Sequence, residues 1–373
     1  MRVLLLAGEE SGVLYARQIR AEILRRDPSA ELRGYEDEGF RIEDLAVMGF
    51  GQVLKRIFYF LRVKRTLERR IDTWRPDVVC TIDYPGLNLK LAAYAKARGV
   101  RTVHVVCPQV WAWRRGRIPK IEAALDRLCC FFPFEPALFT PGFATFVGHP
   151  LVEAFDACAE APGGGGAARR GKTLAVLPGS RMGEIEQHLP VLIETVATLR
   201  RDSRLGAAAM RVVVPAANER AYRAISSALA RAKLPAGAVE VRRGGARAVL
   251  CAADAAVVAS GTATLEAALA NCPTVLVYRV GRLLAAIARR LITGVRHVGL
   301  ANIVAEKSGL PCPMPELLQE DFTAERVQAA VLPWLTDASA AAAARQALSG
   351  TMRLLRREGG AIGRIVDQVM EVG

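Results

Sequence analysis

The sequence predicts an α/β protein made of two Rossmann-like halves, each with a parallel sheet that helices cover on both faces. Short apolar runs alternate with longer helical stretches through most of the 373 residues. The apolar runs are nearly continuous, which is typical of strands buried on both faces of a parallel sheet. A glycine run at Gly163–Gly166 predicts a hinge between the halves.

The predicted elements alternate between strand and helix in both halves. The strands are short and rich in β-branched and aliphatic residues, whereas the helices carry apolar residues at helical spacing. The predicted strands are Val3–Ala7, Asp77–Ile82, Thr102–Val106, Arg127–Phe132, Thr173–Leu177, Arg211–Val214, Ala255–Ala259 and Thr274–Tyr278. The predicted helices include Ser11–Arg26, Leu87–Ala97, Ile185–Arg201 and Asn218–Ala232, and from about Asp337 the chain is helical.

This pattern divides the chain into an N-terminal domain over 1–160, a linker over 161–170 and a C-terminal domain over 171–350. The first apolar run leads directly into Gly8-Glu9-Glu10, which makes it a buried strand rather than the core of a signal peptide. No apolar run approaches the roughly 20 residues that a membrane-spanning helix needs. We therefore expect a cytoplasmic protein.

The chain carries an excess of positive charge, with 51 basic and 37 acidic residues and a net charge of +14. This excess favours an anionic membrane or nucleic acid as partner, although ordinary surface charge is an equal alternative. No nucleic-acid-binding motif is present, so RNA binding is the least favoured interpretation. The eight cysteines show neither a Cys-x-x-Cys pair nor a Cys/His cluster at metal spacing, which predicts reduced, mostly buried thiols and no metal site.

Three segments of the first half contain candidate chemistry. Ser11 is a good N-cap where the first strand turns into a helix. Asp83 follows an apolar strand and is able to accept a proton from an attacking hydroxyl, or else it caps the next helix. Trp111, Trp113 and Arg114 combine aromatic rings with a cation, which suits a sugar or phosphate; the alternative is a pair of tryptophans in the core.

Two turns of the second half suit an anion. Arg181 follows Pro178-Gly179-Ser180 and leads into a helix, so amide groups and a fixed cation would meet there. The second turn joins a strand to a helix through small residues, Ser260, Gly261, Thr262, Ala263 and Thr264. Glu266, one turn further, would accept hydrogen bonds from ribose hydroxyls. Helix capping alone also explains each of these turns. Because both turns lie in the same half, we expect that half to bind a nucleotide diphosphate.

One stretch indicates a lipid-facing helix. Its apolar residues share one helical face: Phe50, Val53, Leu54, Ile57, Phe58 and Leu61. Basic residues flank that face. Phe58 belongs to this face, and Tyr59 lies outside its centre, where it would meet a lipid surface. An ordinary domain helix with solvated arginines is the alternative. A second stretch with basic and apolar residues, 279–296, also indicates contact with a lipid surface.

Nine segments together resemble the lipid-A-disaccharide synthase family, over nearly the whole chain and in order. The segments are AGEESG at 7–12, LAVMGF at 45–50, PDVVCTIDYPGLN at 76–88, VWAWR at 110–114, FPFE at 132–135, FVGHP at 146–150, LPGSR at 177–181, SGTATLE at 260–266 and LANIV at 300–304. The resemblance implies the GT-B fold and an inverting transfer between UDP-2,3-diacylglucosamine and 2,3-diacylglucosamine 1-phosphate. It also implies a β-1,6-linked product, release of UDP, no metal or other cofactor, and a peripheral position on the inner membrane.

The resemblance also implies residue roles. Asp83 matches the family's functional aspartate, Arg181 its nucleotide-side arginine and Asn302 its asparagine. On the acceptor side we expect Glu9, Ser11, Phe58, Tyr59, Trp111, Trp113 and Arg114. As in most GT-B enzymes, the final helix, within 351–373, should pack back on the first domain.

The chain also departs from the family pattern. Val13 and Gly86 stand where the family usually has acids, Ala301 replaces a proline, and Lys307–Met314 resembles a short insertion. Two alternatives therefore stay open. One is another GT-B enzyme that uses UDP-N-acetylglucosamine, and the other is a catalytically silent paralogue that binds lipid or nucleotide.

Overall fold

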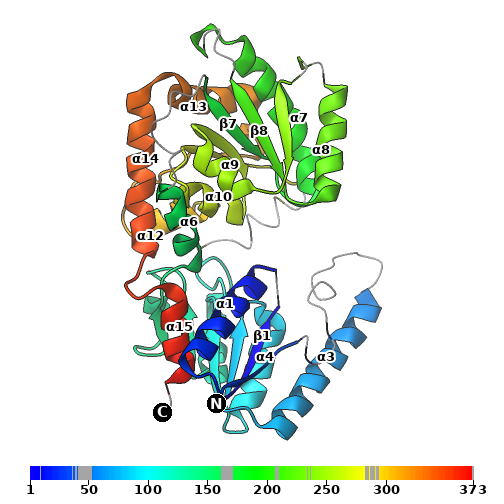
Figure 1. Ribbon diagram of the computed structural model, residues 1–373, viewed down its shortest axis with the longest axis vertical. Helices are drawn as coiled ribbons and strands as arrows, with labels where there is room; N and C mark the ends of the chain where they lie inside the picture. The colour runs from blue at the N-terminus through cyan, green and yellow to red at the C-terminus, as the bar shows by residue number, and fades with distance from the viewer. Residues whose placement is uncertain are drawn as a thin grey trace. The chain divides into compact units, whose positions relative to one another are not determined.

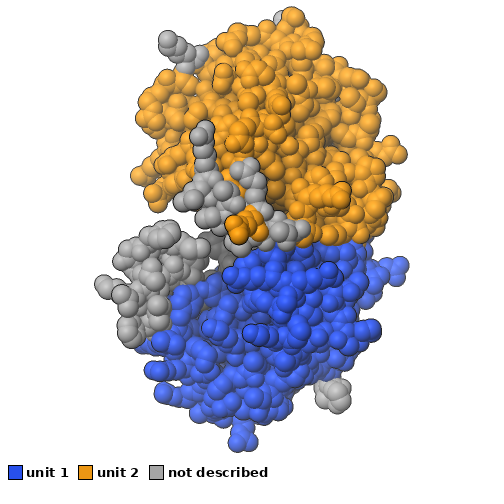
Figure 2. Space-filling view, turned by 180° about the vertical axis from the view of Figure 1, so that it is seen from behind, with its two compact units in different colours: residues 1–150, 355–373 blue, residues 151–354 orange. Residues whose placement is uncertain are grey.

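The computed structural model describes most of the chain (Figure 1), namely residues 1–8, 10–35, 37, 40, 53–160, 171–205, 210–232, 234–235, 237–281, 285, 290 and 294–371. The chain forms two compact units (Figure 2). Unit 1 contains Met1–Pro150 and Leu355–Gly373, and unit 2 contains Leu151–Leu354. The linker expected over 161–170 lies outside the described residues.

Unit 1 is built on a parallel sheet of six strands in the order β2-β1-β3-β4-β5-β6. Helices α1 and α15 bury apolar side chains on one face of this sheet, and α3 and α4 on the other. The strands are β1 (Arg2–Ala7), β2 (Glu31–Arg33), β3 (Val78–Ile82), β4 (Arg101–Val105), β5 (Arg127–Cys130) and β6 (Ala144–Phe146). The helices are α1 (Glu10–Arg26), α3 (Val53–Trp74), α4 (Pro85–Lys96), α5 (Ile118–Ala124) and α15 (Ala361–Met370).

Unit 2 repeats the architecture with a parallel sheet in the order β12-β11-β10-β7-β8-β9. Helices α7 and α13 pack on one face, and α9 and α10 on the other. The strands are β7 (Thr173–Leu177), β8 (Arg211–Ala216), β9 (Val239–Arg243), β10 (Ala255–Ala259), β11 (Thr274–Tyr278) and β12 (Glu316–Leu318). The helices are α6 (Pro150–Glu160), α7 (Met182–Arg201), α8 (Glu219–Arg231), α9 (Ala246–Ala252), α10 (Thr262–Leu269), α12 (Leu300–Lys307), α13 (Ala324–Thr336) and α14 (Ala338–Met352).

The end of the chain returns to unit 1. After α14 the chain passes through a short 3-10 turn, Arg353–Leu355, to α15, which packs against α1. Ile365, Val366 and Val369 are fully buried there. Arg26 of α1 also forms an ion pair with Asp367 at 2.5 Å. The last helix is thus part of the core of the first unit.

The predicted fold class, two Rossmann-like units with parallel sheets, is confirmed. Each of the eight predicted strands coincides with an observed strand to within two residues at either end. The four strands without a sequence signal, β2, β6, β9 and β12, all lie at sheet edges. Edge strands need not be buried on both faces, so they lack the continuous apolar run of a central strand.

The structure corrects two expectations about organisation. Unit 1 ends at Pro150 rather than at 160, because α6 groups with unit 2. Six described cysteines are free thiols, five of them buried, which confirms the expected reduced state for these six. Cys251 is disulfide-bonded, so the expectation is wrong for this residue. No helix among the described residues combines the length and the hydropathy that spanning a bilayer requires.

The predicted lipid-facing helix corresponds to α3, but its core-facing side differs from the prediction. The buried residues are Val63, Leu67, Ile71 and Trp74. Tyr59 packs partly against this same cluster, so it is not presented to a lipid surface as predicted. Leu61, which the prediction placed in the apolar stripe, is instead 42% exposed. The predicted apolar stripe uses residues near the start of α3. The residues that are seen to be buried lie further along the helix and define a different face.

Candidate functional site

Each sheet has a point where the connections diverge. In unit 1 the chain leaves β1 for β2 on one side and later enters β3 on the other side of β1. In unit 2 it leaves β7 for β8 and later enters β10 on the other side of β7. Ligands of open α/β sheets bind outside the carboxyl ends of strands at such switch points. Asp83 comes directly after β3, Arg181 follows β7 and Gly261 follows β10, so each unit carries its own half-site.

The half-site of unit 1 is built on a strained turn between β3 and α4. Asp83 and Tyr84 both have left-handed backbones, with φ of 51° and 49°. Non-glycine residues held in this region cost about 1–3 kcal/mol each and persist only where surrounding contacts fix them. The Asp83 amide donates to the Val105 carbonyl at 2.9 Å. The Tyr84 amide donates to Asp83 Oδ1 at 2.8 Å. Pro85 then begins α4 at the position where proline is favoured.

Asn88 fastens this turn from inside and was not singled out by the sequence analysis. It is fully buried, and its side-chain amide donates to the carbonyls of Asp83 at 2.8 Å and Ile82 at 3.1 Å. Its Oδ1 accepts a hydrogen bond from the Tyr35 hydroxyl at 2.8 Å. Tyr35 is itself buried, so burial raises its pKa and keeps it a donor. An asparagine one turn into a helix carries no sequence signal for this role.

Because Gly8 has no side chain, the β3–α4 turn is able to pack directly against it. A Cβ at Gly8 would lie 2.3 Å from the Cβ of Tyr84, which real Cβ atoms do not tolerate. Gly12 is less constrained, because a Cβ there would meet Ala7 and Ile82 at ordinary contact distances of 3.5 Å. The glycine of the β1–α1 turn therefore lets two neighbouring loops approach each other at the switch point.

The carboxylate of Asp83 is poised to accept a proton. It is half-buried, and burial raises its pKa above the ordinary value even though the Tyr84 amide opposes this shift. Among the described residues, that amide is the one donor to the carboxylate, which leaves Oδ2 available. A raised pKa makes the carboxylate a stronger base at neutral pH.

The β7–α7 turn of unit 2 presents Arg181. This residue is the N-cap of α7, and its side chain is 81% exposed. Its guanidinium contacts Glu184 at 2.9 Å. Gly179 has φ of 116°, and a Cβ there would lie 2.7 Å from a Glu184 carboxylate oxygen. The glycine therefore lets Glu184 reach back to the turn.

His188 ties this turn to the strand on the far side of β10, a role that the sequence did not reveal. The ring is fully buried, and Nδ1 lies 2.8 Å from the Pro178 carbonyl. Its Nε2 accepts from the Arg279 amide at 3.0 Å.

The β10–α10 turn presents an uncapped helix start. Gly261 is the N-cap with φ of 149°, a conformation that L side chains rarely adopt, and nothing lies within 4 Å of where its Cβ would be. No side chain of the described residues caps this helix. The first amides of a helix have no partner within the helix. Those of Thr262 and Ala263 are therefore directed at the open side, where an anion would be stabilised.

Thr264 and Glu266 differ from the prediction in different ways. Thr264 is fully buried, and both its hydroxyl and its amide donate to the Gly261 carbonyl, at 2.8 and 3.1 Å. It therefore shapes the turn and has no donor left for a ligand, which corrects its assignment as a direct contact. Glu266 is half-buried, and burial raises its pKa while Arg247 opposes this shift. Ser260 and Thr262 remain accessible at the same end of the sheet.

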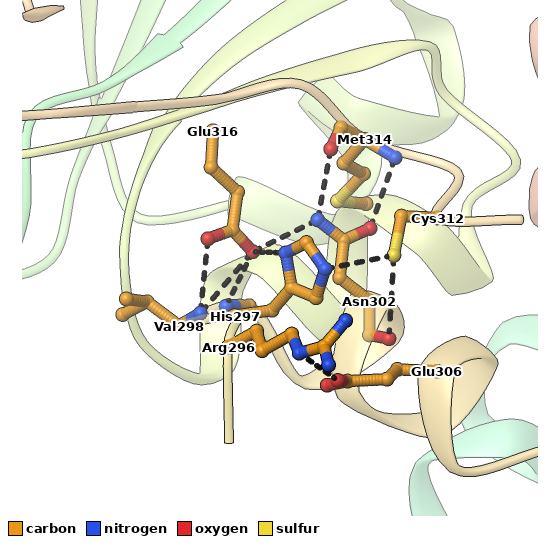
Figure 3. A network of polar contacts seen from close by, with 9 residues as sticks. Arg296, His297, Val298, Asn302, Glu306, Cys312, Met314 and Glu316 are labelled. Atoms are coloured by element: carbon orange, nitrogen blue, oxygen red, sulfur yellow. Dashed lines mark hydrogen bonds and ion pairs between the residues drawn. The ribbon is translucent and has the colours of Figure 1, made fainter. Parts of the chain in front are cut away.

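The Asn302 side chain lies at the centre of a network of hydrogen bonds within unit 2 (Figure 3). It is fully buried, and its Nδ2 donates to the Met314 carbonyl and to a Glu316 carboxylate oxygen, both at 2.8 Å. Its Oδ1 accepts from the Met314 amide at 3.0 Å. Glu316 also accepts from the Val298 and Gly299 amides. The predicted direct contact with nucleotide is therefore corrected: the side chain is already satisfied and holds the loops around α12.

The two tryptophans of the β4–α5 segment have separate environments. Trp111 is buried, with its indole Nε1 donating to Glu135 at 3.0 Å and its ring edge-on to Phe134. The core interpretation holds for this residue and corrects its acceptor-side assignment. Trp113 is 37% exposed, and the Arg114 guanidinium lies 4.5 Å from its ring centre. This pair remains a candidate for contact with a sugar or phosphate.

Three other candidates lie outside what the structure describes. Glu9 falls outside the described residues. Ser11 and Phe58 belong to α1 and α3, but their side chains are not described. Because α1 begins at Glu10, Ser11 lies within the helix and is not its N-cap as predicted.

The fold resembles that of solved glycosyltransferases. A glycosyltransferase of kitacinnamycin matches with a TM-score of 0.62 at 16% identity, covering 99% of this chain and 98% of that one. MurG of Acinetobacter baumannii matches with a TM-score of 0.55 at 12% identity, covering 100% and 99%. At such identities the matches show the fold alone. This fold is the GT-B fold, in which two Rossmann-like domains form one glycosyltransferase.

Sequence relatives narrow the class further. A family model described as lipid-A-disaccharide synthetase matches residues 3–360. A lipid-A-disaccharide synthase of Neisseria gonorrhoeae is 38% identical over 365 residues, covering 94% of this chain and 91% of the relative. The chain therefore belongs to the lipid-A-disaccharide synthase family, whose members are glycosyltransferases of lipid A biosynthesis.

Proposed function

We propose that this chain transfers a 2,3-diacylglucosamine unit from UDP to the 6-hydroxyl of 2,3-diacylglucosamine 1-phosphate. The products are the β-1,6-linked disaccharide and UDP. The observation that carries the proposal is the pair of half-sites: a half-buried carboxylate at the switch point of unit 1 and an uncapped helix start at that of unit 2. A carboxylate suits an attacking hydroxyl, and a helix start suits a leaving diphosphate.

Unit 2 takes the nucleotide in this proposal. The diphosphate lies against the amides of Gly261, Thr262 and Ala263, and the exposed Arg181 swings from Glu184 to the phosphate oxygens. A bidentate guanidinium contact strengthens as charge develops on the departing diphosphate. Glu266, one turn into α10, accepts hydrogen bonds from the ribose. Because helix end and cation both stabilise the leaving group, we propose that transfer needs no metal ion, so activity should survive chelation.

Unit 1 takes the acceptor. Asp83 Oδ2 receives the proton of the 6-hydroxyl as that oxygen attacks the anomeric carbon. The C–O bond to UDP breaks as the new bond forms, so an α-linked donor gives a β-linked product. Trp113 and Arg114 supply an aromatic face and a cation for the acceptor.

Both substrates are anionic lipids, so we propose that the protein works peripherally on an anionic membrane surface, the cytoplasmic face of the inner membrane. The outer face of α3 supports this, because Arg62, Arg65 and Arg69 are exposed beside Leu61. Cations next to an exposed apolar side chain favour a negatively charged lipid surface.

The direct test incubates purified protein with both acylated sugars and follows UDP and disaccharide together. We expect stoichiometric amounts of both products. Replacing the acceptor with unacylated N-acetylglucosamine should abolish transfer. Transfer to the unacylated sugar would instead support another enzyme that uses UDP-N-acetylglucosamine, and binding of UDP without turnover would support a silent paralogue.

A further inference from the structure

A buried cluster in unit 1 joins two thiols and a carboxylate that the transferase chemistry does not use. Cys107 follows β4, Cys130 ends β5 and Glu135 lies in the turn beyond. All three are at least 97% buried. The Cys107 thiol donates a hydrogen bond to the Pro108 carbonyl at 3.3 Å. The three come from separate segments, which is why cysteine spacing gave no indication of the cluster.

The geometry is close to that of a metal site. One sulfur from each cysteine and one carboxylate oxygen all lie within 4.8 Å of one another. Around a tetrahedral zinc ion, ligand atoms at ordinary bond lengths stand about 3.8 Å apart. Shifts of about 1 Å or less would therefore bring the three side chains into coordination distance.

The donor atoms select the class of ion. Two thiolates with one carboxylate suit a borderline-soft ion such as Zn²⁺ and do not suit Mg²⁺ or Ca²⁺, which prefer oxygen donors. The surroundings also favour binding: the site is closed to bulk water, and it is rigidly framed by two neighbouring parallel strands.

We propose that Cys107, Cys130 and Glu135 bind one Zn²⁺-class ion. The ion displaces the two thiol protons, and also the carboxyl proton when Glu135 is neutral, and these protons leave to solvent. Two metal–sulfur bonds and one metal–oxygen bond form, and no electron is transferred.

Binding reaches the acceptor-side turn through Glu135. One of its carboxylate oxygens accepts from the Trp111 indole, and the other accepts from the Phe132 amide, both at 3.0 Å. An ion bound to the oxygen that accepts from Trp111 would compete with the indole N–H for that oxygen. The ion therefore perturbs the turn that presents Trp113 and Arg114, while the UDP half-site in unit 2 is untouched.

The test titrates the full-length, phosphine-reduced protein with Co²⁺ and then with Zn²⁺. A Cys312→Ala background is used, because the exposed Cys312 sulfur lies 3.1 Å from His297 Nε2 and would offer a competing site (Figure 3). We expect one ion per chain, a thiolate-to-cobalt charge-transfer band that Zn²⁺ removes, and release of about two or three protons per ion. A cobalt spectrum without a thiolate band would overturn the proposal.

Neighbouring cysteines give a matched pair of variants. Cys130→Ala should lose the band and weaken Co²⁺ binding by more than about tenfold. Cys129→Ala, the preceding residue on β5, should keep both, since Cys129 packs in a different apolar cluster. Equal binding by the two variants would refute the site. If Cys130→Ala does not fold by circular dichroism, Cys107→Ala is measured against the same control.

Discussion

The proposed base and the proposed phosphate-binding cation differ in how firmly the protein holds them. Asp83 is half-buried on a left-handed turn that Asn88 fastens from inside, so its position is set before any substrate binds. Arg181 is 81% exposed and forms an ion pair with Glu184, which a phosphate is able to replace. A fixed base and a movable cation match their proposed tasks, because a proton acceptor must be placed accurately whereas a phosphate clamp must close on its ligand.

Substitution of Arg181 tests the clamp. Arg181→Ala should weaken UDP binding about 10- to 100-fold, the usual value of a hydrogen bond from a charged group. Isothermal titration with UDP measures the change. Arg204→Ala is the matched control, because Arg204 also forms an exposed ion pair near the surface, with Asp202. Equal affinities of the two variants would remove Arg181 from the nucleotide site.

Glu135 predicts a pH dependence of stability in metal-free protein. Burial raises its pKa from the ordinary 4.5 to about 8. Between these values the folded chain keeps a proton that the unfolded chain releases. The stabilisation is therefore complete below about pH 4.5 and is lost as the pH rises through about 8. The slope reaches at most about 1.4 kcal/mol per pH unit.

Urea unfolding across this pH range, with chelator present, measures the effect. In Glu135→Gln the fall in unfolding free energy toward pH 8 should flatten, whereas Glu320→Gln, at an exposed position, should keep the wild-type slope. Parallel curves for wild type and Glu135→Gln would show that this carboxyl does not carry the dependence.

At the scale of elements, close approach of two loops places the base. Gly8→Ala would put a Cβ 2.3 Å from Tyr84, which forces the β3–α4 turn to move. Because a displacement of about 1 Å at a reacting group is enough for a 100-fold loss, turnover should fall about 100-fold with UDP affinity unchanged. Steady-state kinetics measure it. Gly12→Ala, with ordinary 3.5 Å contacts, should retain turnover, and wild-type rates in Gly8→Ala would argue against a constrained turn.

The outer face of α3 predicts membrane affinity. Changing Arg62, Arg65 and Arg69 to Glu should cost at least about 1 kcal/mol of anionic-vesicle binding per residue, and added salt should weaken wild-type binding. Sedimentation with vesicles measures both effects. The same triple change at Arg220, Arg223 and Arg231 of α8 gives an equal change in net charge and should bind as wild type does. Equal losses would mean that net charge, not this face, governs binding.

At the scale of the whole molecule, the sequence predicts those elements whose burial requires a regular pattern of apolar residues. The eight central strands followed from continuous apolar runs, and the positions of Asp83, Arg181 and Gly261 followed from the ends of those strands. Edge strands escaped prediction because they lack that pattern. Hydrogen-bond partners escaped it too: Asn302 and Trp111 have suitable chemistry for ligands, but Glu316 and Glu135 already satisfy them. His188 and Asn88 join segments far apart in the chain, which no local pattern records.

The most direct measurement is the turnover of Asp83→Asn beside its affinity for UDP. Asparagine retains an oxygen for the Tyr84 amide, so the turn is preserved while the base is lost. If Asp83 accepts the proton of the acceptor hydroxyl, disaccharide formation falls about 10²- to 10⁴-fold and UDP binds as tightly as before. Wild-type turnover in this variant would mean that the carboxylate plays no part in the transfer.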